Sequence, residues 1–202
     1  MKLKAGRVRN LTMSYLKRPL LFARANVPSR RTYLKTLHWA MAPLFLWFMF
    51  VQPSDVARVG RWAVELHSVL GLVFVTGALI WTADYMRRGL ASRPGPKLPK
   101  PARQIHQLLH KVLIWGIFGV ALTGFGLGVT SMTQLWAGGI VPIGVPLSLP
   151  RMNDLIGRIH EVEFYTLAAI AIFHALFHIW RHVILKDNAL RIMAPKRLHR
   201  FL

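Results

Sequence analysis

Histidines are the residues of this chain whose type and spacing could do chemistry. A neutral imidazole binds transition metals and haem iron through a ring nitrogen, and ionisable groups within apolar segments are costly and usually functional. The chain has nine histidines, most of them in or beside long apolar segments: His38, His67, His106, His110, His160, His174, His178, His182 and His199. Metal or haem binding is therefore the first chemistry to consider.

The spacing of His160 and His174 predicts two binding levels on one helix. The residues are 14 positions apart. In an α-helix that advance returns to within about 40° of the same face and rises about 21 Å. Two levels near opposite membrane surfaces would each take a partner from another helix. The order of the apolar segments pairs His67 with His160 at one level, and it pairs His38 with His174 at the other.

This arrangement favours haem over zinc. A tetrahedral zinc site needs ligands that converge within a few ångströms, whereas these four histidines fall into two levels. Haem iron takes two imidazoles on opposite faces, in a flat apolar slot that a four-helix bundle supplies. With both axial positions filled, the centre serves electron transfer. The chain has no cysteine, which excludes thiolate ligands and iron–sulfur clusters.

Small residues near the proposed ligands allow the same interpretation. Gly71 follows His67 by about one helical turn, and Gly157 precedes His160 by about one turn. Three further glycines, Gly124, Gly126 and Gly128, recur along another apolar segment. These glycines either make room for a macrocycle or allow close helix packing. The simpler alternative for the histidines is interhelical hydrogen bonding in a bundle without a cofactor, which would be colourless.

Four apolar segments must position these side chains. They cover residues about 37–51, 62–83, 106–130 and 159–182, close to the roughly 20 residues that cross a bilayer. A lipid-exposed span satisfies its backbone internally, so each segment is predicted to be helical, with a kink at Pro43. The predicted fold is an all-α membrane protein, a four-helix transmembrane bundle over residues 36–185. The proline-rich stretch 93–101 is predicted to be a loop, and the uncharged stretch 138–150 to lie at the interface or fold back over the bundle.

The charge distribution predicts the orientation. The chain is 53% hydrophobic yet carries a net charge of +20. Its lysines and arginines precede the first span, separate the second from the third, or follow the fourth, with Lys111 and Arg181 at the ends of the third and fourth spans on the same side. The exceptions are Arg58, Arg61, Arg151 and Arg158. By the positive-inside rule both termini and the proline-rich loop are cytoplasmic. Because the charge follows membrane topology, nucleic acid is not expected as a partner.

Basic segments flank the bundle. Residues 1–35 form a basic leader, and residues 186–202 a basic tail. Within the leader, residues 11–25 alternate apolar and basic side chains, as a helix lying on the anionic membrane surface would. The leader could equally dock a protein partner.

Several motifs of the chain resemble those of the prokaryotic cytochrome b561 family over residues about 33–195. They are His38-Trp39, Glu65-Leu66-His67, His106 to His110, Arg158-Ile159-His160-Glu161, and the stretch from His174 through His182 to Lys186-Asp187-Asn188. The resemblance implies four helices, two b haems and a place in the bacterial inner membrane. It also implies the same four axial ligands, His38 with His174 and His67 with His160, and electron exchange with ubiquinone.

The expected function is therefore a di-haem cytochrome that carries electrons across the membrane, with superoxide as one candidate donor. Candidate contacts for quinone or substrate are His106, His110, Arg181, His182 and Arg158. For His178 and for the histidines among these contacts, facing lipid headgroups at the basic membrane edge is the simpler alternative. A second hypothesis is an electron-transfer or anchoring cytochrome b subunit of a larger membrane complex, docked through the leader. A third is a structural bundle without haem.

Overall fold

The computed structural model describes residues 28–143, 145–194 and 196–201. The predicted surface helix at 11–25, and most of the leader 1–35, lie outside the described residues. The chain falls into two compact units, residues 1–36 and 37–202. The following description concerns the second unit and the helix that leads into it.

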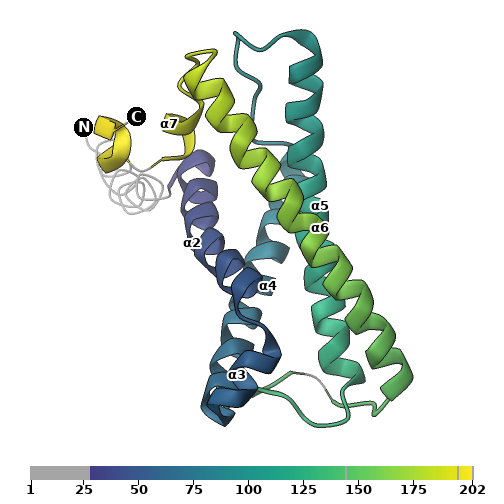
Figure 1. Ribbon diagram of the computed structural model, residues 1–202. Helices are drawn as coiled ribbons and strands as arrows, with labels where there is room; N and C mark the ends of the chain where they lie inside the picture. Colours follow the sequence, from purple (N-terminus) through teal and green to yellow (C-terminus); the bar gives the residue numbers. More distant parts are fainter. Residues whose placement is uncertain (1–27, 144, 195, 202) are drawn as a thin grey trace, which may run out of the picture. The chain divides into compact units, whose positions relative to one another are not determined.

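Four long helices dominate the described chain (Figure 1). They are α2 (Arg30–Phe50), α4 (Arg61–Arg88), α5 (Lys100–Thr130) and α6 (Pro150–Val183). Shorter elements are α3 (Pro53–Val59), α7 (Ala189–Met193), the 3₁₀ helix η1 (Lys196–Phe201), and an antiparallel pair of two-residue strands, β1 (Trp136–Ala137) and β2 (Val141–Pro142). Each predicted apolar segment falls within or ends beside one of the long helices.

Three of these helices, α4, α5 and α6, are each long and apolar enough to cross a membrane. The fourth candidate span consists of α2 and α3 together, which are bent by 80° at the break between them. Pro43 lies inside α2, but the large bend comes at residues 51–52. There Pro53 opens α3, and the backbone N–H of Gln52 donates to Asp55 Oδ2 at 3.0 Å. The helical membrane bundle is therefore confirmed, with its first span broken.

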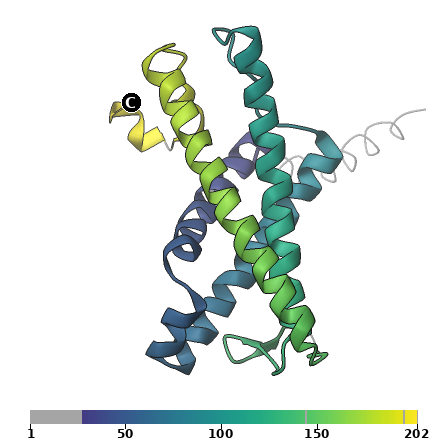
Figure 2. The ribbon, with the colours of Figure 1, turned by 45° about the vertical axis from the view of Figure 1, so that its right-hand side comes forward.

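Helix α5 packs between α4 and α6 in the second unit. The chain direction alternates from α4 to α5 to α6, as both ribbon views show (Figures 1 and 2). We call the end formed by the end of α4, the start of α5 and the end of α6 the basic end, and the opposite end the far end. A Cβ added at Gly116 would lie 2.7 Å from Leu167 Cδ1, so this glycine permits the close approach of α5 and α6.

Buried apolar side chains form small, separate clusters along the bundle. One buried cluster joins Met41, Phe74, Ala78 and Ala121, and a second joins Val120, Phe164 and Leu167. Many large apolar side chains on the outer faces of the helices stay exposed, among them Trp115, Leu122 and Phe125. Exposed apolar faces of this extent suit contact with lipid.

The two predicted connections differ in how they are held. The proline-rich connection lacks helix over residues 89–99. The predicted loop 93–101 is therefore confirmed except at its last two residues, which open α5. Arg103 fixes the connection by donating to the carbonyls of Leu98 and Pro96 at 2.8 and 3.1 Å. At the far end, the segment after α5 returns over the bundle. Gly138 N–H donates to Glu65 O at 3.3 Å, and Leu149 N–H donates to Thr130 O at 3.2 Å.

Candidate functional site

A cavity of about 540 Å³ lies among α2, α4, α5 and α6 at the far end. His67 of α4 and His160 of α6 both line it. The volume falls in the range of sites that enclose a small molecule or cofactor. Four glycines also line the cavity: Gly71, Gly124, Gly128 and Gly157.

Gly124 is the glycine that directly accommodates a candidate ligand. A Cβ at this position would lie 3.2 Å from Cε1 of His160, closer than nearly all real contacts of this kind. Gly128 serves a different purpose, because its added Cβ would meet Ile143 Cγ2 of the far-end connection at 3.0 Å. At Gly71 and Gly157 the nearest atoms are 3.9 and 3.7 Å away, so their missing side chains leave space along the cavity wall.

Hydrogen bonding fixes the tautomer of His160. Nδ1 of His160 lies 2.9 Å from Thr123 Oγ1. The same hydroxyl donates to Glu163 Oε2 at 2.9 Å and has two backbone carbonyls within 3.2 Å. Those other partners only accept, so the hydroxyl proton points to one of them and Nδ1–H of His160 must donate to the hydroxyl oxygen. Nε2 therefore keeps its lone pair, as a metal-ligating imidazole requires.

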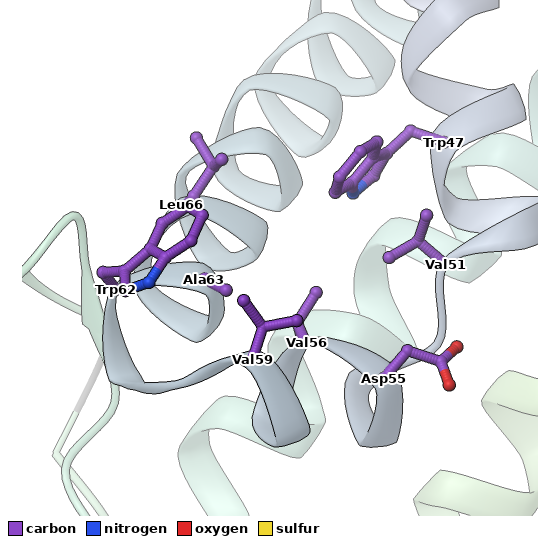
Figure 3. Close-up of a pocket in the computed structure, with 8 residues that line it drawn as sticks. All are labelled: Trp47, Val51, Asp55, Val56, Val59, Trp62, Ala63 and Leu66. Carbon is purple, nitrogen blue, oxygen red and sulfur yellow. The ribbon is translucent and has the colours of Figure 1, made fainter.

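The ring of His67 is held by aromatic neighbours of α2. It lies edge-on to Phe48, with ring centroids 4.9 Å apart. Nε1 of Trp47 lies 3.4 Å from His67 Nδ1, a long contact in which the indole N–H donates. Trp47 also borders a second, smaller hollow of about 190 Å³ among α2, α3 and α4. Figure 3 shows Trp47 and Trp62 on opposite sides of this hollow, with Val56 and Val59 along its floor.

Four histidines meet at the basic end, two from each of two helices. His106 and His110 of α5 have ring centroids 4.3 Å apart, and His174 and His178 of α6 have centroids 4.5 Å apart. The two pairs meet through His110, whose centroid lies 4.7 Å from that of His174. Each pair uses the i, i+4 spacing that places side chains one above the other on a helix.

His38 reaches the same end of the bundle from α2. Its ring lies edge-on to Trp81 of α4, with centroids 6.1 Å apart. It is close enough to interact electrostatically with His110, His174 and His178. His38 and His174, the predicted partners, thus lie at the same level, with the other histidines of α5 and α6 beside them.

Several imidazole nitrogens at the basic end are buried without a hydrogen-bond partner among the described residues. They are Nδ1 of His106, Nδ1 of His174, Nε2 of His178 and Nδ1 of His182. Buried polar atoms are nearly always paired. A cluster of unpaired imidazole nitrogens, together with the glycine-lined cavity at the far end, fits a protein that holds an iron or metal centre.

The predicted contacts for quinone or substrate do not form one site. His106 and His110 belong to the histidine group at the basic end. Arg181 is 1% exposed, and its guanidinium is bound to Asp187 Oδ2 at 2.9 and 2.7 Å. His182 lies one residue further along the last turn of α6. Arg158 lies near the start of α6, largely exposed and 3.2 Å from Asp154.

Sequence reasoning missed three residues of these sites. Glu163 follows His160 by three positions and so shares its helical face, a signal that was available. Thr123 left no such signal, because its contact with His160 depends on how α5 and α6 are aligned. His178 was assigned no role beyond facing the membrane edge, although it lies one turn from His174.

The comparisons with known proteins give one match. A family model described as prokaryotic cytochrome b561 matches residues 30–196, a range that includes all four long helices and every histidine except His199. Searches of curated proteins and of solved structures returned no match. The chain therefore belongs to the prokaryotic cytochrome b561 family, and it is a multi-pass membrane cytochrome that binds haem b and transfers electrons.

Proposed function

We propose that the chain holds two b haems, one at each end of the bundle, and carries electrons between the two membrane surfaces. His67 and His160 hold iron at the far end, and His38 and His174 hold it at the basic end. The observation that carries this proposal is the far-end cavity, which two histidines from different helices line together with four glycines. Haem bound there would supply one-electron transfer.

The far-end residues have separable roles in this proposal. His160 offers Nε2, because Thr123 and the carboxylate beyond it engage Nδ1. Gly124 leaves the imidazole room to stand against α5. His67 would hold iron through Nε2 with a proton on Nδ1, and in that state Nδ1 could not accept the long hydrogen bond from Trp47 Nε1.

The basic-end residues support a second centre on the same helix. His174 follows His160 by four turns of α6, about 21 Å along the axis. Nδ1 of His174 is buried without a partner among the described residues, and His38 of α2 reaches the same level. With both levels filled, α6 contributes one ligand to each centre and fixes the distance between them.

The proposal extends to the partners of electron transfer. Ubiquinone is the proposed exchange partner within the bacterial inner membrane, because the family resemblance implies it. Superoxide is a candidate electron donor at the far end, where an anion would be attracted by four arginines: Arg58, Arg61, Arg151 and Arg158. Two of these are already ion-paired on the surface, Arg61 with Glu65 and Arg158 with Asp154, which weakens their attraction.

The direct test is to count haem in purified protein and in single variants. We expect two b haems per chain in the wild type. His67→Ala or His160→Ala should remove one haem, and His38→Ala or His174→Ala should remove the other, as resolved by redox titration of the difference spectrum. His199→Ala, outside the family match, is the matched control. One haem per chain, or variants that lose both haems or neither, would reject the assignment.

The partner proposal needs a separate assay. Protein with both haems in place should be reduced by ubiquinol analogues or reoxidised by ubiquinone, and superoxide should reduce it only if it is a donor. Rapid exchange with quinone but none with superoxide would leave the di-haem cytochrome intact and reject superoxide. No exchange with quinone would reject ubiquinone and favour the larger-complex hypothesis.

A further inference from the structure

The histidine group at the basic end contains a compact triad that the proposed haem ligands do not include. One ligating nitrogen from each of His106, His110 and His178 lies within 4.8 Å of the others. We propose that these three histidines bind a divalent transition-metal ion of the Zn²⁺ class, separately from haem. Two histidines at i, i+4 on one helix with a third from a neighbour form a recurring zinc arrangement.

Hydrogen bonds at His110 leave the nitrogen that a metal needs. Nδ1 of His110 lies 2.7 Å from the carbonyl oxygen of His106. A carbonyl only accepts, so Nδ1 carries the proton and Nε2 carries the lone pair. A backbone carbonyl bound to the opposite ring nitrogen is the usual support of a metal-ligating histidine, because it fixes both tautomer and ring orientation.

The other two members also present a nitrogen that is not otherwise engaged. His106 is fully buried; its Nε2 lies 3.2 Å from Ser92 Oγ, and its Nδ1 has no partner among the described residues. Nε2 of His178 is likewise buried without a partner in that part of the chain. Each of the three imidazoles thus has a ring nitrogen available for a metal, and one ring nitrogen of each lies within 4.8 Å of the others.

The surrounding charges are compatible with a cation. Arg181 interacts electrostatically with all three imidazoles. Its charge is partly balanced by Asp187, which is 2.7 Å away and, like Arg181, only 1% exposed. Arg181 opposes added positive charge at the triad, and Asp187 offsets part of this effect at His178. Three neutral imidazoles leave a fourth tetrahedral position for water or another ligand. Imidazole ligands suit Zn²⁺, Cu²⁺ and Ni²⁺ rather than Mg²⁺ or Ca²⁺.

The test uses the full-length purified chain in detergent, with its haem as isolated, after treatment with a chelator. Isothermal titration with Zn²⁺ should detect one site per chain, and Co²⁺ should give the visible absorption of tetrahedral nitrogen coordination. His106→Ala, His110→Ala and His178→Ala should each weaken binding by more than about tenfold, since even loss of a supporting contact has an effect of that size. The matched control is His199→Ala, a histidine outside this group, which should bind as the wild type does.

Haem content, measured on the same samples, separates this proposal from the proposed function. We expect the haem count to be unchanged in all three triad variants, which also shows that they are folded. Loss of a haem in His110→Ala or His178→Ala would assign that residue to the haem site and overturn the metal proposal. Equal Zn²⁺ affinity in the triad and control variants would overturn it too. Failure of the di-haem assignment would leave the Zn²⁺ titration readable, because the titration does not depend on haem.

Discussion

The hydroxyl oxygen of Thr123 lies 2.9 Å from Nδ1 of His160 and links that imidazole to a carboxylate on the same helix. The contact joins α5 to α6 behind the His160 ring, which lines the far-end cavity. A ligating imidazole that donates to such a partner becomes a stronger electron donor to iron, which favours the oxidised state.

Removing this link should raise the reduction potential of the haem that we propose at the far end. Thr123→Val keeps the shape of the side chain but loses the hydroxyl, so we expect an upward shift on the order of 40 mV, equivalent to about 1 kcal/mol for one hydrogen bond. Redox titration of the purified protein measures the shift. Thr123→Ser keeps the hydroxyl and should behave as the wild type. An unchanged potential in Thr123→Val would mean that His160 is not an iron ligand.

A methyl group at residue 124 should displace His160. The added Cβ of Gly124→Ala would lie 3.2 Å from the imidazole, so the ring must move and the far-end haem should be lost in part or entirely. Gly126→Ala is the matched control, since its Cβ would meet Ile156 at an ordinary 3.5 Å. Haem per chain, measured for both variants, gives the result. Full haem content in Gly124→Ala would remove the steric argument for this glycine.

The buried ion pair at the basic end should contribute much more stability than the exposed pair at the far end. Asp187→Ala leaves the fully buried guanidinium of Arg181 unpaired, and a loss of about 3–5 kcal/mol is expected. Asp154→Ala breaks the exposed pair with Arg158 and should cost less than about 1 kcal/mol. Thermal unfolding of both variants in the same detergent compares them. Similar melting temperatures would show that the buried pair does not hold this end together.

The predicted orientation can be tested because the chain has no cysteine. Single cysteines at exposed positions, Ile140→Cys at the far end and Arg93→Cys at the basic end, mark the two sides. With both termini cytoplasmic, a membrane-impermeant thiol reagent should label residue 140 in intact cells and residue 93 only after lysis. The opposite labelling pattern would reverse the orientation inferred from the charges.

The sequence predicted the helices better than it predicted their ends. The second apolar segment was placed at about 62–83, and α4 covers Arg61–Arg88, because a helix continues past the hydrocarbon into the region where its basic residues lie. The sequence predicts a kink at Pro43, which lies inside α2. The large bend of the first span, 80°, comes instead after Phe50. That bend depends on Pro53, which starts α3, and on the hydrogen bond from the Gln52 N–H to Asp55. Sequence reasoning does not predict it.

The candidate sites were predictable to the extent that one helix determines them. The levels of His160 and His174 follow from their spacing along α6. The convergence of His106 and His110 with His178 does not, because it requires the alignment of α5 against α6. The two-level spacing disfavours zinc only for the four proposed haem ligands. It does not apply to the triad, because the triad consists of other residues.

The bend between α2 and α3 makes the shape of the cavity depend on the thickness of the surrounding bilayer. Val51, Gln52 and Pro53, the residues at the bend, form part of the cavity wall, so the broken first span lines the cavity where α2 ends and α3 begins. A span that is too short for a thicker bilayer thins the lipid around it locally. Occupancy of the far-end centre should therefore vary with the acyl-chain length of the membrane.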